Sequence, residues 1–267
     1  MRTSNPVFAS EMYQEAPSWA GMLAGATDRP RTMTVQGTAW KTLYLLLITI
    51  AAAAASWGMY QNNPGLILPT MIGSLVGGFV SGIVMFRLPK FAGFLVPIFA
   101  FAEGLFVAAI SVAIVHYSPL ASRVGGDAAA YALVGQAAGL SLAIAAGMLF
   151  GYATGVLRLS GLLAKAVVVM TIGVGLYYLG SFVVNLAFGA GTIPRIDYSA
   201  SPIGIAFSVL VIVLASLMLL LDFQWIDDGV KRGLPKHFEW IGAFGILTSI
   251  VWLYIEVLKL LAKLRSE

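Results

Sequence analysis

The chain alternates long apolar runs with short polar or Pro/Gly-rich breaks, a pattern that predicts membrane-spanning helices. A helix rises about 1.5 Å per residue, so about 20 apolar residues cross the hydrocarbon core of a bilayer. Six runs have that length, at residues 42–60, 66–86, 93–115, 130–157, 162–188 and 202–226. A seventh begins between 238 and 247 and ends near 261. The predicted fold is all-α, a polytopic membrane protein built as a seven-transmembrane-helix bundle.

The composition indicates that lipid is the solvent for most of this surface. Hydrophobic residues make up 59% of the 267 positions, charged residues make up 10%, and the mean hydropathy is +0.89. A soluble domain carries about a quarter charged residues, so this chain is too poor in charge for a water-exposed surface. The absence of cysteine excludes disulfides, thiolate metal sites and cysteine nucleophiles. No basic cluster with interleaved aromatics occurs, so nucleic acid is not an expected partner.

The polar ends and the basic residues predict the domain organisation and the orientation. Residues 1–38 are rich in Ser, Pro, Gly and Thr, and we expect a flexible cytoplasmic tail there, followed by a transmembrane bundle at 39–264. Lys and Arg concentrate in cytoplasmic loops. With the N-terminus inside, the inner loops hold Arg87, Lys90, Arg158, Lys165, Lys231, Arg232 and Lys236. The outer loops then hold only Arg123 and Arg195.

The basic residues at the end of the chain do not fit this orientation. Lys259, Lys263 and Arg265 follow the last apolar run and would lie outside if that run crosses fully. The last helix therefore either crosses against the rule or enters the membrane and returns as a re-entrant element.

Three carboxylic acids lie within the apolar runs, at Glu103, Asp222 and Glu256. A charge at bilayer depth costs from about 2.5 to more than 10 kcal/mol, so such residues face the bundle interior, pair, or carry protons or ions. Glu103 is either a protonated carboxyl bonded to a backbone carbonyl or a pore carboxylate. Glu256 has Lys259 three positions on, which fits a surface ion pair.

An alternative for Glu256 is a pair with Asp222, in which two close carboxyl groups share a proton and form a pH switch. In two simple antiparallel spans these residues would lie near opposite membrane faces. They meet if the last helix starts late, around Leu247, with Gly242-Ala243-Phe244-Gly245 as the break. We therefore expect a late-starting last helix.

Three stretches resemble the Bax inhibitor-1-like family, also called the transmembrane Bax inhibitor motif family. They are Phe99-Ala100-Phe101-Ala102-Glu103-Gly104-Leu105, Leu221-Asp222-Phe223-Gln224-Trp225-Ile226 and Trp252-Leu253-Tyr254-Ile255-Glu256-Val257-Leu258-Lys259-Leu260-Leu261. In the last of these, Glu256 stands where the family usually has an aspartate. The resemblance spans about residues 40 to 264 and implies a bacterial inner-membrane protein.

The resemblance also implies a function, a pH-sensitive passive calcium leak in which calcium is the transported ion and no cofactor takes part. It implies that Asp222 and Glu256 are the pH-sensing pair and contact calcium transiently, and that Arg87 is a latch partner. Glu103 is the candidate pore carboxylate. Calcium prefers hard oxygen ligands, which these carboxyl groups supply.

Two other function classes remain open. An interaction protein could restrain a membrane-bound protease or modulate a stress response, with the tail at residues 1–38 as the docking segment. An enzyme is not expected, because the only histidines are His116 and His237 and neither has the spacing of a His-Glu-x-x-His zinc site.

Overall fold

The computed structural model describes residues 32–189, 192 and 195–265. Within these residues, seven helices are long and apolar enough to cross a membrane. They are α3 Val35–Asn62, α4 Ile67–Arg87, α5 Ala92–Val112, α6 Asp127–Ala153, α7 Gly161–Phe188, α8 Pro202–Lys231 and α9 Phe238–Leu264. The all-α membrane fold with seven spans is confirmed.

Short turns join the spans. They are the 3-10 helices η1 Pro64–Leu66, η2 Pro89–Phe91, η4 Ala121–Arg123 and η5 Ile196–Tyr198, and the π turn η3 Ala113–Tyr117. The bundle has two ends. The Thr34 end contains the start of α3 and the loops that follow α4, α6 and α8. The opposite end, with the loops after α3, α5 and α7, is the Asp197 end.

The N-terminal boundary differs from the predicted one. Residues 1–31 of the expected tail lie outside the described residues, but α3 begins at Val35, four residues before the predicted bundle. Thr34 is its N-cap, and the Thr34 hydroxyl accepts a hydrogen bond of 2.9 Å from the Gly37 amide. Satisfying an amide at the helix start explains why the helix extends into this polar sequence.

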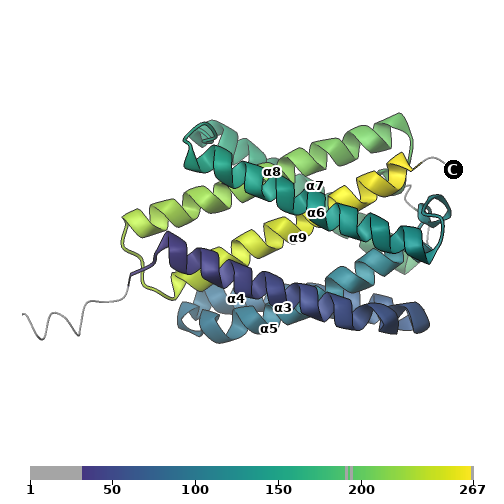
Figure 1. Cartoon of the computed structure of the whole chain (residues 1–267), viewed down its shortest axis with the longest axis horizontal. Helices are drawn as coiled ribbons and strands as arrows, with labels where there is room; N and C mark the ends of the chain where they lie inside the picture. Colours follow the sequence, from purple (N-terminus) through teal and green to yellow (C-terminus); the bar gives the residue numbers. More distant parts are fainter. Residues whose placement is uncertain (1–31, 190–191, 193–194, 266–267) are drawn as a thin grey trace, which may run out of the picture. The chain divides into compact units, whose positions relative to one another are not determined.

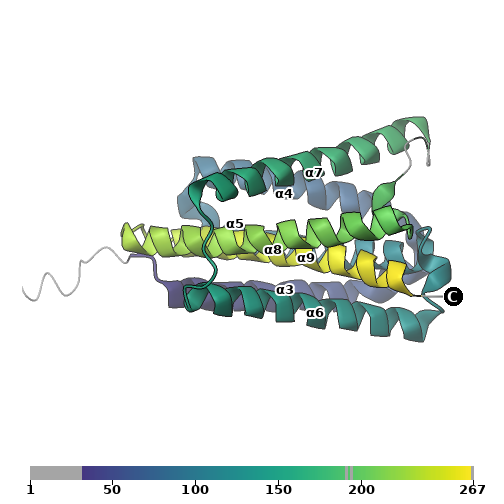
Figure 2. The same ribbon diagram turned by 90° about the horizontal axis from the view of Figure 1, so that it is seen from above.

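Helix α9 is the centre of the bundle. In Figure 1, α9 lies between a group formed by α3, α4 and α5 and a group formed by α6, α7 and α8. In Figure 2, turned by 90°, it again lies in the middle, with α4 and α7 above it and α3 and α6 below it. Within its most apolar window 61% of the residues are buried, against 11% for α7 and 0% for α4. Polar groups on α9 are therefore the ones best shielded from lipid.

The outer faces of the peripheral helices carry large apolar side chains. Phe79, Phe150 and Leu162 are 72%, 72% and 81% exposed. In water such a surface would drive aggregation, whereas hydrocarbon solvates it. These faces agree with a bundle surrounded by acyl chains.

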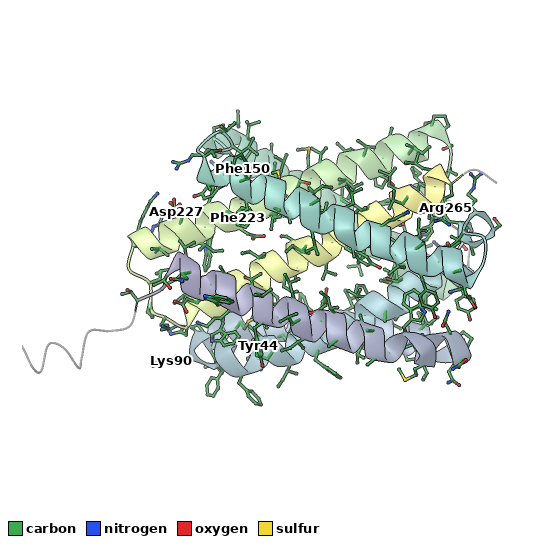
Figure 3. All side chains as sticks on the ribbon, viewed as in Figure 1. Tyr44, Lys90, Phe150, Phe223, Asp227 and Arg265 are labelled. Atoms are coloured by element: carbon green, nitrogen blue, oxygen red, sulfur yellow. The ribbon has the colours of Figure 1, made fainter. Side chains whose placement is uncertain are left out.

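The last helix crosses the whole bundle. It begins at the Thr34 end with Phe238, and after its end the Arg265 guanidinium donates 2.8 Å to the Val124 carbonyl, in the loop that follows η4. Figure 3 labels Lys90 and Asp227 at one end of the bundle and Arg265 at the other. Of the two arrangements considered for α9, a full crossing is the one observed.

Candidate functional site

Asp222, in the part of α8 nearer the Thr34 end, faces α9. The Ser249 hydroxyl donates to Asp222 Oδ2 at 2.5 Å. On the same face of α9, one turn earlier, Gly245 leaves room for the carboxylate, because a Cβ added there would lie 3.1 Å from Asp222 Oδ1. No described residue forms an ion pair with Asp222. Within the described part of the chain, its only hydrogen-bond partner is therefore a neutral hydroxyl.

Glu256 lies elsewhere on α9 and has different partners. It is 1% exposed; its Oε1 accepts a hydrogen bond from the Tyr178 hydroxyl on α7 at 2.9 Å and forms an ion pair with Lys259 Nζ at 2.7 Å. Seven residues separate it from Ser249, the partner of Asp222, which is about 10 Å along a helix axis. The direct proton-sharing pair of Asp222 and Glu256 is not formed, and that expectation was wrong.

The reason lies in the start of α9. The helix runs without a break from Phe238, so the expected start near Leu247 was also wrong. Gly242 and Gly245 mark close packing rather than a break. A Cβ on Gly242 would lie 3.0 Å from Ile226 Cγ1 and 3.1 Å from Thr38 Cγ2. These glycines let α3 and α8 approach α9, and the two acids stay at different depths.

A cluster of buried charges surrounds Glu256 at the Asp197 end. Lys259 Nζ lies 3.9 Å from Asp197 Oδ2, 3.2 Å from the Tyr178 hydroxyl and 4.4 Å from the centre of the Tyr178 ring. Asp197 is 1% exposed and Lys259 is 3% exposed. The expected pair of Glu256 and Lys259 exists, but it is buried rather than on the surface.

Asp197 is held by a loop residue. Arg195 Nε and NH2 donate to its two carboxylate oxygens at 3.2 and 2.7 Å. Burial lowers the pKa of Arg195, but the hydrogen bonds to Asp197 and the neighbouring charges outweigh it, so that this pKa lies above its ordinary value. Burial also raises the pKa of Tyr198, on which the guanidinium lies, to about 12. Both groups therefore keep their charge states at physiological pH.

Glu103, on α5, lines a cavity of about 460 Å³ between α4, α5 and α9. Phe244 and Thr248 of α9 line the same cavity. No described residue forms a hydrogen bond or ion pair with Glu103. Next to it, Gly104 packs so closely that an added Cβ would lie 2.4 Å from the Thr49 carbonyl oxygen of α3. Tight α3–α5 packing therefore fixes the part of α5 that carries Glu103 beside the cavity.

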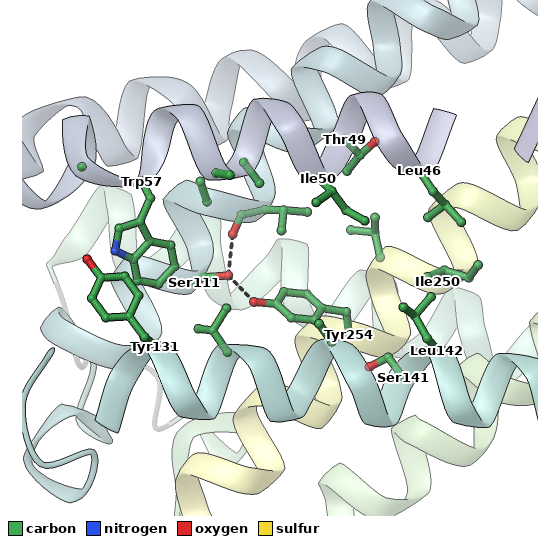
Figure 4. A pocket seen from close by; sticks show the side chains of 18 residues that line it. Leu46, Thr49, Ile50, Trp57, Ser111, Tyr131, Ser141, Leu142, Ile250 and Tyr254 are labelled. Carbon is green, nitrogen blue, oxygen red and sulfur yellow. Dashed lines mark hydrogen bonds between the residues drawn. The ribbon is translucent and has the colours of Figure 1, made fainter. Parts of the chain in front are cut away.

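The larger cavity of the bundle, about 540 Å³, has no charged residue in its lining. It lies between α3, α5, α6 and α9, and Figure 4 shows the Ser111 and Tyr254 side chains hydrogen-bonded on its floor, with an oxygen separation of 2.7 Å. Trp57 and Tyr131 stack at one end, with ring centres 5.5 Å apart. The lining offers a cation neutral hydroxyl groups but no charged ligand, so the candidate ion site lies with the carboxyl groups.

The sequence model of one family matches residues 5–266, nearly the whole chain. The chain belongs to the Bax inhibitor 1 like family. A search of curated proteins found none that matches it. As a Bax inhibitor 1 like protein it is a multi-pass membrane protein, and the resemblance noted in the sequence is confirmed at the level of the family.

The site residues carried over by that resemblance do not converge in this Bax inhibitor 1 like chain. Arg87 is exposed at the end of α4, and no described acidic residue pairs with it. Among the described residues, no group of three or more His, Asp or Glu side chains could hold a metal. A calcium contact shared by Asp222 and Glu256 would need the two carboxyl groups to meet, which they do not.

Sequence reasoning singled out neither of two buried acids, Asp197 and Glu239. Glu239, in the first turn of α9, is fully buried and forms an ion pair with Lys41 of α3. Its Oε1 also accepts 3.0 Å hydrogen bonds from the amide and hydroxyl of Thr34. This contact ties the start of α3 to the start of α9. Acids are common at helix starts, so the position of Glu239 alone did not mark it as a buried ion-pair partner.

Proposed function

We propose that this Bax inhibitor 1 like protein is a pH-sensitive passive cation leak, with calcium as the favoured ion. The observation that carries the proposal is the Asp222 carboxyl, which lies within a spanning helix against α9 with a serine hydroxyl as its only partner among the described residues. Ionisable residues within transmembrane helices mark ion or proton pathways by default. Family membership supports a membrane role but does not by itself specify the ion.

The proposed switch is a proton on Asp222 alone. An ionised carboxylate attracts a cation, and a protonated one does not, so cation flux is expected to rise as Asp222 loses its proton. The Ser249 hydroxyl, 2.5 Å from Asp222 Oδ2, can donate a hydrogen bond to the carboxylate once that proton is lost. Glu103, on the other side of α9, is proposed as a second carboxylate that a passing ion meets. Weak, transient coordination suits a leak.

We also propose that the Thr34 end faces the cytoplasm of a bacterial inner membrane. The basic residues Arg87, Lys90, Arg158, Lys231, Arg232 and Lys236 belong to this end. Lys259 and Lys263, which seemed to oppose this orientation, are buried in the bundle and so do not count as loop charges. Without these two lysines, the excess of loop Lys and Arg at the Thr34 end over the Asp197 end is larger.

Calcium flux into vesicles reconstituted with purified protein tests the proposal. Flux should change with pH in the natural chain, and Asp222→Asn should remove that change because an amide cannot titrate. Asp228→Asn is the matched control, since Asp228 lies on the same helix but is exposed. Protein that passes no cation at any pH would contradict the proposal.

The alternative role, restraint of a membrane protease through the N-terminal tail, stays a separate hypothesis. Residues 1–31, on which it mostly depends, lie outside the described residues. Deleting only residues 1–31 is the sharper test, because the Met33 amide donates to the Leu234 carbonyl and Thr34 bonds to Glu239. An interaction role should suffer from this deletion, whereas flux should not.

A further inference from the structure

Lys259 occupies a site built from groups that attract cations. Its ammonium nitrogen lies 2.7 Å from Glu256 Oε1, 3.2 Å from the Tyr178 hydroxyl and 3.9 Å from Asp197 Oδ2. The Tyr178 ring lies beneath it at 4.4 Å, a separation that allows a cation–π contact. These groups come from α7, from η5 and from α9, so the site is assembled by the tertiary fold.

Glu256 retains unused capacity for a cation. Its Oε2 is buried and has no hydrogen-bond partner, although the residue is only 1% exposed. A carboxylate oxygen left without a partner in a low-dielectric interior is costly, and it indicates that the site prefers a positive charge nearby. If Lys259 were absent, Glu256 would keep only the Tyr178 hydroxyl as a partner.

The other nearby cationic side chains form no hydrogen bond or ion pair with Glu256 among the described residues. Lys263 Nζ donates to the Gly204 carbonyl at 2.8 Å and to the Ser208 hydroxyl at 2.7 Å, both neutral groups. Arg195 is bound to Asp197 through two nitrogens. Lys259 is therefore the one described cation within ion-pair distance of Glu256.

We propose that Glu256, Tyr178 and Asp197 form a cation site, and that the ammonium group of Lys259 fills it as a tethered occupant that excludes small mobile cations. A primary ammonium is the ligand chemistry that the site accepts. Calcium is a second candidate, because two carboxylates and a phenol supply oxygen ligands and water can complete the set. The consequence for ion passage rests on the proposed function, because a filled site at the Asp197 end limits cation flux only if the protein conducts.

Truncating Lys259 and supplying a free amine in solution tests whether the site binds an ammonium group, without measuring flux. Lys259→Ala removes a propylammonium-sized part of the side chain. The purified variant should unfold several degrees below the natural chain on heating, and propylammonium chloride should restore most of that loss, since a ligand that binds only the folded state raises its stability. Calcium chloride is added in a separate arm. The natural chain should not respond to propylammonium, because its site is full.

Two matched variants make the test specific. Lys231→Ala removes a lysine with the same 2.7 Å separation from a carboxylate, but on the exposed surface, and should gain no response to propylammonium. Lys259→Ala combined with Glu256→Gln removes both charges and should also gain none. Folded yield with and without propylammonium throughout purification is itself a readout. A Lys259→Ala protein recovered only with the amine supports the site.

The outcomes are decisive in either direction. A Lys259→Ala protein that ignores propylammonium and calcium alike, or that fails to fold in their presence, would overturn the site, because neither cation would then replace the Lys259 ammonium. Calcium flux is measured afterwards. Lys259→Ala should pass more calcium than the natural chain, on the order of tenfold, the lower end of what electrostatic focusing produces. No flux in either protein would refute the proposed leak but leave a positive amine response standing.

Discussion

Asp222 and Glu256 lie on neighbouring helices of one bundle, yet the surroundings of the two carboxyl groups differ in what balances the charge. Asp222 has a serine hydroxyl and a glycine beside it, while Glu256 has an ammonium and a phenol. A carboxyl without a cation can exchange protons or ions at little structural cost. A carboxyl locked into a buried ion pair cannot, because breaking the pair leaves an uncompensated charge. The difference assigns the responsive role to Asp222 and a structural role to Glu256.

The largest expected effect comes from breaking the buried pair. Lys259→Met keeps an apolar stem but removes the charge next to Glu256, and should lower the free energy of unfolding by about 3–5 kcal/mol. Lys231→Met, in the exposed pair with Asp227, should cost about 1 kcal/mol or less, because water screens that pair. Thermal unfolding of the two variants in the same detergent compares them directly. Equal effects would mean that burial does not distinguish the two pairs.

A smaller effect should follow from filling the space beside Asp222. In Gly245→Ala the new methyl group would lie 3.1 Å from Asp222 Oδ1, so α8 or the carboxylate must move. Such overpacking costs about 1–3 kcal/mol. Gly73→Ala on α4 is the control, since nothing lies within 4 Å of its added Cβ. The pH dependence of flux should change in Gly245→Ala and not in Gly73→Ala.

Effects of similar or smaller size distinguish the hydroxyl partners of the two acids. Ser249→Ala leaves Asp222 without its hydrogen-bond donor and should cost about 1–3 kcal/mol, whereas Tyr178→Phe leaves Glu256 with Lys259 and should cost about 0.5–1.5 kcal/mol. Stability is measured as before. In flux assays Ser249→Ala should move the pH midpoint and Tyr178→Phe should not. A shift in Tyr178→Phe alone would reverse the roles of the two acids.

The spans were predictable because hydropathy and length decide them. The fifth and sixth predicted segments start within one residue of α7 and α8, and turn residues such as Pro64 marked the breaks. The positions of helix ends were predicted less accurately. The fourth segment was expected to reach 157, but α6 ends at Ala153, after which Gly155 takes a φ of 76° and the Leu157 amide donates to the Gly151 carbonyl at 2.9 Å. That turn depends on local hydrogen bonds that hydropathy does not report.

The partners of the buried acids could not be predicted. The spacing of Glu256 and Lys259 gave their pairing, but not its burial, because burial depends on Tyr178 and Asp197, which are distant in sequence. Counting Lys259 and Lys263 as loop charges treated them as solvated, although both lie inside α9. Which acids of a membrane bundle meet is set by helix register, and a shift of seven residues moves a side chain by about 10 Å.

The most direct test of the account compares the pH profile of calcium flux in two variants reconstituted into identical vesicles. Asp222→Asn should pass calcium at a rate that no longer varies with pH. The double variant Glu256→Gln with Lys259→Met, which removes the buried pair as a neutral unit, should keep the pH dependence of the natural chain. A pH-dependent Asp222→Asn protein, or a double variant that folds but has lost its pH response, would contradict the assignment of the switch to Asp222.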